Sequence, residues 1–352
     1  MQAIIKYYGR VLMKTLLITG GAGFIGTNTV DYFASAGWKV IVLDNLSRKG
    51  SAENLFWLQS NKEYSFDFLQ LDICDKDAID QVFLDYKISA LIHLAGQVAV
   101  TSSVIDPHND FTINIYGTFN LLEAVRRFSP ETVFINASTN KVYGELDYLE
   151  IIESEERYDF NSNIIGINED ISLDFHSPYG CSKGSADQYV LDYARTYSLN
   201  TTSFRQSCIY GPRQFGSEDQ GWISWFIYAV LTNKEISIYG DGKQVRDVLY
   251  VDDLIRAYDM AINNPDIIKG QTFNIGGGIT NSISLLEFLN ILSNHMNKDI
   301  PFSFKDVRPG DQKVYISDTN KLYNKLGWKP KITSHEGIKL ILDWTENNLN
   351  SK

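Results

Sequence analysis

The feature that most constrains this chain is a short apolar run followed at once by three regularly spaced glycines. Residues 15–19 have the composition of a buried strand, Gly20, Gly23 and Gly26 come next, and a helical pattern continues to residue 33. Glycines at this spacing let the backbone turn tightly, approach a pyrophosphate and pack the helix close to the strand. The helix N-terminus supplies N–H groups and partial positive charge for the phosphates. The segment therefore predicts a dinucleotide-binding unit.

A second apolar run, residues 39–43, ends in Asp44. A carboxylate at the end of that strand can accept hydrogen bonds from a ribose 2′-hydroxyl, which favours NAD over NADP. Arg48 is close by in the sequence and leaves NADP as an alternative, because a guanidinium can hold a 2′-phosphate. We therefore expect NAD as the cofactor.

Apolar runs and helical patterns continue to alternate as far as residue 205. Further strands are expected at residues 66–71, 90–94, 132–136 and 201–205. Strands that alternate with helices predict an α/β fold, here a Rossmann-type doubly wound parallel sheet with a smaller α/β substrate-binding lobe. Ligands of such sheets bind at the carboxyl ends of the strands.

Several polar or small residues follow these strands and should meet at that edge. Asp72 follows the third strand, where an acid could contact an adenine amino group, although a helix capped near residue 75 is the alternative. Small residues where a cofactor could pass follow the fourth strand, and two hydroxyl residues follow the fifth: Ala95, Gly96 and Gln97, then Ser138 and Thr139. His93 lies within the fourth strand and is interpreted as a packed core histidine.

A Tyr and a Lys four residues apart begin a later helical pattern. Pro178 precedes that helix, and Tyr179 and Lys183 should lie one turn apart on the same face. An ammonium group beside a phenol favours the phenolate, so we expect Lys183 to lower the pKa of Tyr179. The pair could then accept a proton near neutral pH, provided that the strand ends place a substrate beside it.

The pattern changes after residue 205. Helices are expected at 222–231, 284–296 and 335–347, a strand at 273–275, and a hairpin turn at Asp241-Gly242. We divide the chain into an extension (1–12), a cofactor-binding domain (13–204) with an insertion (145–176), and an interleaved substrate lobe (205–352). The acidic insertion is either a surface loop or a lid over the substrate. Three loop arginines could bind a diphosphate: Arg213, Arg246 and Arg308.

Composition excludes several other classes of protein. The chain has 352 residues, a net charge of −11 and no run of five basic residues, so neither nucleic acid nor an anionic membrane is expected as a partner. Three cysteines without metal-ligand spacing predict no metal site and fit a reducing cytoplasm. No apolar stretch has the length of a membrane helix or of a signal-peptide core.

Taken together, these motifs resemble the extended short-chain dehydrogenase/reductase family, in its branch that modifies sugar nucleotides. The resemblance covers the chain after residue 13. Its motifs are residues 20–26, Asp44-Asn45-Leu46, residues 93–96, Ser138-Thr139, Tyr143-Gly144, residues 179–183, Tyr210-Gly211-Pro212 and Arg246-Asp247. It implies that Tyr179 is the acid/base, that Lys183 orients the nicotinamide ribose, and that Ser138 or Thr139 hydrogen-bonds the reacting hydroxyl.

The resemblance also implies two sets of binding residues. Those expected at the cofactor are Gly20, Gly23, Phe24, Ile25, Gly26, Asp44, Asn45, Ser47, Arg48, Asp72, Ile73, Leu94, Ala95, Gly96, Gln97, Asn114, Tyr179, Lys183 and Gln206. Those expected at the substrate are Gln97, Thr139, Asn140, Arg205, Arg213, Gln214, Arg246, Arg308 and Asp311.

The segment before Val142 narrows the reaction. Family members that dehydrate the sugar carry Asp and Glu where this chain has Asn140 and Lys141, so dehydration is not expected. Longer strings, including 44–50, 94–98, 138–144, 173–183 and 219–222, resemble the 2-epimerases of CDP-linked 3,6-dideoxyhexoses that serve O-antigen synthesis. The resemblance implies a CDP-sugar substrate, transient oxidation to a 2-keto sugar, and a homo-oligomer, either a tetramer or a dimer.

Three alternatives stay open at this point. The chain could be a UDP-hexose or UDP-hexuronate 4-epimerase, or could epimerise C2 of another CDP-hexose such as CDP-glucose. A non-catalytic NAD-sensing regulator is the third, although such proteins usually lose the Tyr or the Lys and this chain has both.

Overall fold

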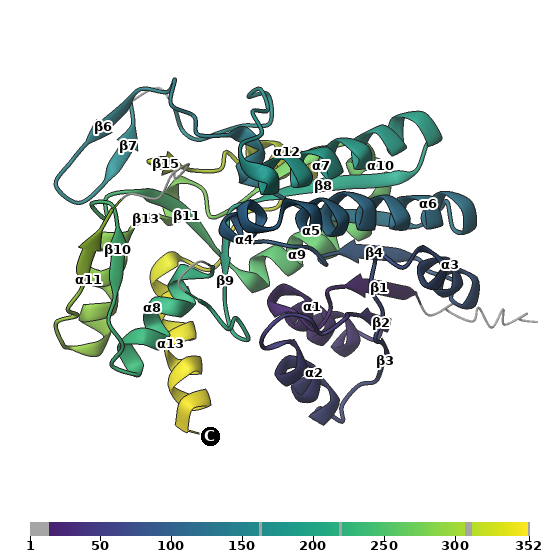
Figure 1. The fold of residues 1–352 in the computed structure, drawn as a ribbon, viewed down its shortest axis with the longest axis horizontal. Helices are drawn as coiled ribbons and strands as arrows, with labels where there is room; N and C mark the ends of the chain where they lie inside the picture. Colours follow the sequence, from purple (N-terminus) through teal and green to yellow (C-terminus); the bar gives the residue numbers. More distant parts are fainter. Residues whose placement is uncertain (1–13, 162–163, 218–219, 307–311, 351–352) are drawn as a thin grey trace, which may run out of the picture.

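Seven parallel strands form the central sheet, in the order β12-β8-β5-β4-β1-β2-β3. The computed structural model describes residues 14–161, 164–217, 220–306 and 312–350, so the predicted extension 1–12 lies outside the described residues. The predicted strands are present, and the α/β fold class is confirmed (Figure 1). The strands are β1 Thr15–Thr19, β2 Lys39–Leu43, β3 Phe66–Leu69, β4 Ala90–His93, β5 Val133–Thr139, β8 Asn200–Gln206 and β12 Thr272–Ile275.

Each face of the sheet has its own hydrophobic core. Leu16 and Ile18 of β1 point to one core, which also contains side chains of α1 and α9, whereas Leu17 points to the other, which contains side chains of α3, α6 and α7. This two-residue alternation is what a strand buried on both sides requires. The flanking helices are α1 Phe24–Ser35, α2 Ser51–Ser60, α3 Lys76–Asp85, α6 Thr118–Phe128, α7 Ser177–Tyr197, α9 Val251–Ile262, α10 Pro265–Ile268 and α12 Asn320–Leu326.

The connection between β4 and α6 is broken into short pieces. It contains α4 Val100–Ile105, α5 Pro107–Phe111 and a wide π-type turn, η1 Thr112–Gly117. The π turn η1 runs directly into α6, so the chain enters this helix through a turn of π geometry. Single π turns inside helices commonly mark functional sites.

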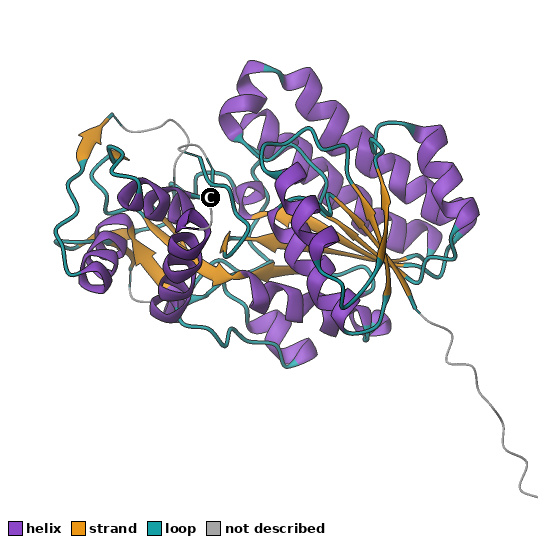
Figure 2. Cartoon of the chain, turned by 90° about the horizontal axis from the view of Figure 1, so that it is seen from below, coloured by secondary structure: helices purple, strands orange, loops and turns teal. Residues whose placement is uncertain are grey.

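The second lobe contains small sheets covered by helices (Figure 2). Strand β11 pairs with β13, β15 and β9, and β10 pairs in parallel with β14. The last strand of the central sheet, β12, comes from this part of the sequence. The elements are β9 Cys208–Tyr210, α8 Trp222–Leu231, β10 Ser237–Tyr239, β11 Val245–Tyr250, η3 Ile279–Asn281, β13 Ser282–Ser284, α11 Leu285–Met296, β14 Ser303–Lys305, β15 Val314–Tyr315 and α13 Ser334–Asn350.

The predicted hairpin at Asp241-Gly242 is wrong. Strand β10 pairs with β14 rather than with β11, and Gly240 N–H donates to the Lys305 carbonyl at 2.9 Å. The Asp241 carboxylate accepts a hydrogen bond from Tyr158, so the turn contacts the insertion. An Asp-Gly pair specifies a chain bend, but it does not specify which strand lies beside the bend.

The insertion 145–176 forms a small antiparallel pair, β6 Ile151–Glu153 and β7 Tyr158–Phe160. Its apolar side chains share a core with Val245, Val314 and Tyr315 of the second lobe. Arg157 adds ion pairs with Glu287 and Asp159. The described part of the insertion thus buttresses the second lobe, and its residues do not line the two adjoining cavities described below. Of the two interpretations that the sequence left open, the structure does not support a lid over these cavities.

Candidate active site

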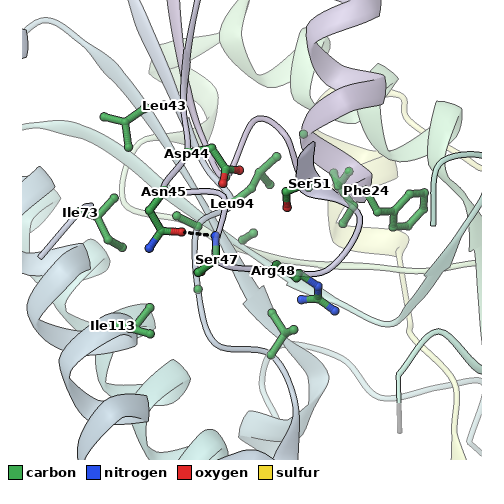
Figure 3. A pocket seen from close by; sticks show the side chains of 18 of the residues that line it. Phe24, Leu43, Asp44, Asn45, Ser47, Arg48, Ser51, Ile73, Leu94 and Ile113 are labelled. Carbon is green, nitrogen blue, oxygen red and sulfur yellow. Dashed lines mark hydrogen bonds between the residues drawn. The ribbon is translucent and has the colours of Figure 1, made fainter. Parts of the chain in front are cut away.

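A cavity of about 230 Å³ lies along the carboxyl ends of β2, β1, β4 and β5. It is lined by most of the residues that the sequence assigned to the cofactor (Figure 3). These are Gly20, Gly23, Phe24, Ile25, Gly26, Asp44, Asn45, Ser47, Arg48, Asp72, Ile73, Leu94, Ala95, Gly96, Tyr179, Lys183 and Gln206. Leu43, Ser51, Leu71, Val98, Ile113, Ala137 and Ser138 complete the lining.

Close contacts with backbone atoms leave no room for a side chain at two positions of the glycine-rich turn. Gly20 has φ of +69°, and a Cβ there would lie 2.7 Å from the Ala95 nitrogen. A Cβ at Gly26 would lie 2.2 Å from the Gly20 carbonyl oxygen. Gly23 is the N-cap of α1. Glycine has no side chain that could accept a hydrogen bond from the first N–H groups of the helix, and the first turn contains no acidic residue. The helix N-terminus therefore faces the cavity as an anion site.

Asp44 lies at the end of β2, with its carboxylate on this cavity (Figure 3). One oxygen accepts from Ala22 N–H at 3.0 Å and the other from Leu46 N–H at 2.8 Å. Burial raises the pKa of this carboxyl above its usual value, against the lowering effect of these two hydrogen bonds. The carboxylate is held in a fixed orientation and keeps lone pairs for a diol.

Asp72 also lines the cavity. Its carboxylate accepts from Asn45 Nδ2 and Cys74 N–H, each at 2.8 Å. Burial acts to raise its pKa, but these hydrogen bonds outweigh burial and lower it. Asp75, rather than Asp72, caps α3 by accepting from Ala78 N–H. Asp75 thus takes the capping role, and the contact of Asp72 with an adenine amino group stays a prediction.

A second cavity of about 740 Å³ adjoins the first and reaches into the second lobe. Both cavities are lined by Phe24, Ile25, Val98, Tyr179 and Gln206, so these five residues mark the junction. The rest of the second lining is Val100, Thr101, Val104, Thr139, Asn140, Lys141, Ser207, Cys208, Ile209, Tyr210, Gln214, Gln220, Gly221, Trp222 and Ile223. Thr139, Asn140 and Gln214 were assigned to the substrate from the sequence.

Tyr179 lies at the junction, on the first turn of α7, and Lys183 lies one turn later. Burial raises the pKa of the Tyr179 phenol to about 12, although a hydrogen bond with the Thr139 side chain acts in the lowering direction. Burial lowers the pKa of Lys183 to about 8, and its Nζ donates to the Ala137 carbonyl at 2.5 Å. The expected lowering of the Tyr179 pKa by Lys183 is therefore wrong for the protein alone, because the cost of burying a phenolate dominates.

The two hydroxyl residues after β5 face different cavities. Ser138 lines the first cavity, and its buried Oγ has no hydrogen-bond partner within the described parts of the chain. Thr139 lines the second cavity beside Tyr179, and its Oγ1 accepts from Lys141 N–H at 3.2 Å. An unpartnered buried hydroxyl costs free energy until a ligand satisfies it. Thr139 is the better placed of the two to meet a substrate hydroxyl.

Several predicted substrate contacts lie outside the lining of these two cavities. Arg213 lines a smaller cavity of about 50 Å³ together with Gly23, Arg48 and Gln214. Arg205 is buried and pairs with Asp187 at 2.8 Å, and it lines neither cavity. Arg213 stacks on Trp57, with 3.9 Å between its guanidinium carbon and the ring centroid, and lies 5.6 Å from the Trp344 ring. Both guanidinium groups are thus engaged by protein side chains. Arg308 and Asp311 lie outside the described residues.

Three further predictions concern residues near the cavities rather than in their lining. Burial raises the pKa of Cys208, which lines the second cavity, and the charge of Arg246 acts in the lowering direction, so Arg246 lies near that wall. Gln97 and Asn114 were expected at the cofactor. The Asn114 side chain accepts from Gln97 N–H at 2.9 Å and donates to the Gln97 carbonyl at 3.0 Å. The Gln97 side chain donates instead to the Ala99 carbonyl at 2.8 Å and to Asp110 at 3.0 Å.

His93 is the core histidine that the sequence predicted. It is 1% exposed and contacts Thr19 Oγ1 at 2.7 Å and Thr118 Oγ1 at 2.9 Å. Thr118 already donates its hydroxyl proton to the Asn114 carbonyl, so His93 Nε2 is the protonated nitrogen. Burial and the charge of Lys183 lower the His93 pKa to about 3, which keeps the ring neutral.

Sequence reasoning missed the residues that distant segments bring to the junction. Val98 lines both cavities and follows directly on the predicted residues 95–97, so loop continuity was a usable signal. Cys208 and Trp222 enter the second cavity from the second lobe and gave no local signal. Asp110, buried behind Lys183, also gave none.

Comparison with known proteins agrees with this geometry. Residues 17–341 match the family model described as GDP-mannose 4,6 dehydratase. CDP-paratose 2-epimerase of Salmonella typhi is 47% identical over 337 residues, covering 94% of this chain and 99% of that protein. The structure of UDP-glucose 4-epimerase from Thermotoga maritima with UDP-glucose has a TM-score of 0.81 and 33% identity, covering 95% of this chain and 99% of that one. UDP-glucuronic acid 4-epimerase from Bacillus cereus, in complex with UDP-glucuronic acid and NAD, has a TM-score of 0.81 and 28% identity, with the same coverage.

Proposed function

The chain belongs to the family of NAD-dependent nucleotide-sugar epimerases and dehydratases, and we propose that it is a CDP-sugar 2-epimerase that converts CDP-paratose to CDP-tyvelose. The observation that carries the proposal is the 47% identity, over nearly the whole of both chains, to the Salmonella typhi enzyme of that activity. The substrate pocket agrees with it, since Asn140 and Lys141 occupy the positions where the family's dehydratases carry carboxyl groups.

The first cavity fits NAD. Gly20 and Gly26 leave room only for backbone, Asp44 presents a carboxylate for the ribose, and the buried Ser138 Oγ has no described protein partner. When bound, NAD⁺ supplies a hydride acceptor that later returns the hydride, and its positive charge favours a phenolate nearby. Asp44, Asn45 and Asp72 would hold the adenosine half, and Lys183 the nicotinamide ribose.

The side chains around the junction would move the protons. Tyr179 accepts the proton of the substrate C2 hydroxyl as C2 is oxidised, and it is the residue common to both cavities. Thr139 hydrogen-bonds the same oxygen and lowers the cost of forming the phenolate. The resulting 2-keto sugar reorients so that the opposite face of C2 is presented for reduction. Tyr179 then returns a proton to the C2 oxygen as C2 is reduced.

The second cavity also suits a dideoxy sugar. Val98, Val100 and Val104 give it an apolar wall, and Val98 reaches the junction. A hydroxyl pressed against that wall would lose its hydrogen bonds to water, at a cost of about 1–3 kcal/mol. Carbons without hydroxyls, as in a 3,6-dideoxyhexose, avoid this cost. The apolar wall therefore favours CDP-paratose over CDP-glucose.

The experiment is an incubation of the purified protein and NAD⁺ with CDP-paratose, followed by NMR of the C2 proton. We expect an equilibrium mixture with CDP-tyvelose and no net NADH. CDP-glucose, UDP-glucose and UDP-glucuronic acid serve as matched alternatives. Inversion at C4 of a UDP-sugar without reaction of CDP-paratose would replace the proposal by a 4-epimerase, and no reaction with any substrate would favour an NAD-sensing role.

Three finer assignments accompany the proposal. We place the enzyme in O-antigen sugar synthesis, in the cytoplasm and as a homotetramer or homodimer. In the described part of the chain, none of the helices has the length and apolar character needed to cross a membrane. Light scattering of the purified protein tests the oligomeric state.

A further inference from the structure

A buried carboxylate lies behind the catalytic pair and is used by none of the steps above. Asp110, on α5, is fully buried. One oxygen accepts from Gln97 Nε2 at 3.0 Å and from Asn114 Nδ2 at 3.2 Å. Burial raises the pKa of this carboxyl, while hydrogen bonds from Ser182 and Gln97 and the charge of Lys183 act in the lowering direction. A buried ionised group is retained only where a nearby charge compensates it.

The hydrogen bonds of Asp110 lead directly to α7. Asn114 Nδ2 also donates to Ser182 Oγ at 3.0 Å, and Ser182 Oγ donates to the Tyr179 carbonyl at 3.1 Å. Asn114 Oδ1 accepts from Gln97 N–H at 2.9 Å and lies 3.0 Å from the position of a Cβ on Gly96. Asp110 therefore contacts both the loop that lines the cofactor cavity and the helix turn between Tyr179 and Lys183.

Lys183 is the cation that compensates Asp110. Lys183 Nζ lies 4.0 Å from the same Cβ position on Gly96, which places the ammonium beside the Asn114 and Gln97 cluster. A second carboxylate, Asp187, also faces Lys183, but Arg205 already neutralises it at 2.8 Å. Of these two carboxylates, only Asp110 has no arginine of its own.

We propose that Asp110 is a positioning residue, a buried counter-ion that helps to keep Lys183 protonated and, through Gln97 and Asn114, fixes the loop beside the nicotinamide end of the cavity. The proposal rests on the role given to Tyr179 and Lys183 in the proposed function. It makes the charge state of Lys183 depend on a residue that contacts neither cavity.

The charged groups around Tyr179 and Lys183 determine the direction in which the pKa of each should shift. Burial lowers the pKa of Lys183, and the Asp187 and Asp110 carboxylates act to raise it. Burial raises the pKa of Tyr179, the Thr139 hydrogen bond and Arg48 act to lower it, and Asp110 acts to raise it, while the buried His93 is neutral. Removing one negative charge therefore lowers both pKa values. If the phenolate and the ammonium are both needed, the acid and alkaline limbs of the activity profile move together to lower pH.

The test is the pH profile of kcat/KM for Asp110→Asn with saturating NAD⁺. We expect both limbs to shift to lower pH by roughly 0.5–1 unit, the size of one partly screened charge at close range. Asp106→Asn is the matched control, because Asp106 only caps the same helix, and its profile should not move. Gln97→Met should weaken NAD⁺ binding without moving the limbs.

A measurement on the unmodified protein keeps the proposal testable if Asp110→Asn does not fold. The rate of Lys183 acetylation against pH, followed by mass spectrometry, gives the Lys183 pKa, which we expect near 8. A Lys183 that titrates below pH 7, or unshifted limbs in a folded Asp110→Asn variant, would overturn the proposal. Because acetylation does not need turnover, this readout is independent of whether CDP-paratose is the substrate.

Discussion

The two cavities that meet at Tyr179 are built in different ways. The cofactor cavity collects residues that directly follow successive parallel strands, and its lining agrees closely with the sequence-based expectation. The substrate cavity draws on segments that are far apart in the sequence, residues 98–104, 139–141, 206–214 and 220–223, and these include parts of α4, β9 and α8. The location of a residue at the end of a parallel strand therefore follows from the strand pattern. The location of a residue in the other segments depends on how the two lobes pack together.

The arginines illustrate the second case. Arg213, Arg246 and Arg308 were predicted to bind a diphosphate from loops of the substrate lobe. Arg205, at a strand end, was assigned to the substrate by the family resemblance. In the structure Arg205 forms a buried ion pair and Arg213 stacks on Trp57. A guanidinium suits phosphate, carboxylate and aromatic partners equally well. The residue type alone therefore could not choose among them.

The largest expected effect is at the residue common to both cavities. Tyr179→Phe removes the proton acceptor and should lower kcat about 10³-fold, within the range of general acid–base catalysis. Epimerisation of CDP-paratose measures the loss, and NAD⁺ affinity, which should change little, is the control. A variant that kept wild-type kcat would show that the residue at the junction of the two cavities is not the proton acceptor.

The next effect separates stability from substrate binding. Arg205→Met leaves Asp187 buried without its cation and should cost roughly 3–5 kcal/mol of unfolding free energy, measured by urea denaturation. Arg213→Met loses the stacking on Trp57 and should cost only about 0.5–2 kcal/mol.

The opposite pattern would contradict this assignment. An Arg205→Met variant with unchanged stability and a raised KM for the CDP-sugar would restore the sequence-based prediction of a substrate contact.

The smallest effect tests the cofactor cavity. Gly26→Ala places a methyl group 2.2 Å from the Gly20 carbonyl oxygen and should cost about 1–3 kcal/mol of stability while weakening NAD⁺ binding. Gly37→Ala is the matched control, because a Cβ there meets no atom within 4 Å and only the positive φ is strained. Equal NAD⁺ affinity in the two variants would show that the turn tolerates a side chain and that its glycines are not required.

The sequence by itself determined the sheet and the cofactor edge, because strand periodicity, glycine spacing and terminal acids act over a few residues. It also placed Tyr179 and Lys183 one turn apart on the same helix. Tertiary structure decided that burial raises the Tyr179 pKa to about 12, since desolvation depends on everything packed around a group. It decided that Thr139 rather than Ser138 faces the substrate side, and it brought Asp110 behind Lys183. Those placements depend on packing between segments far apart in the chain, and no local pattern carries that information.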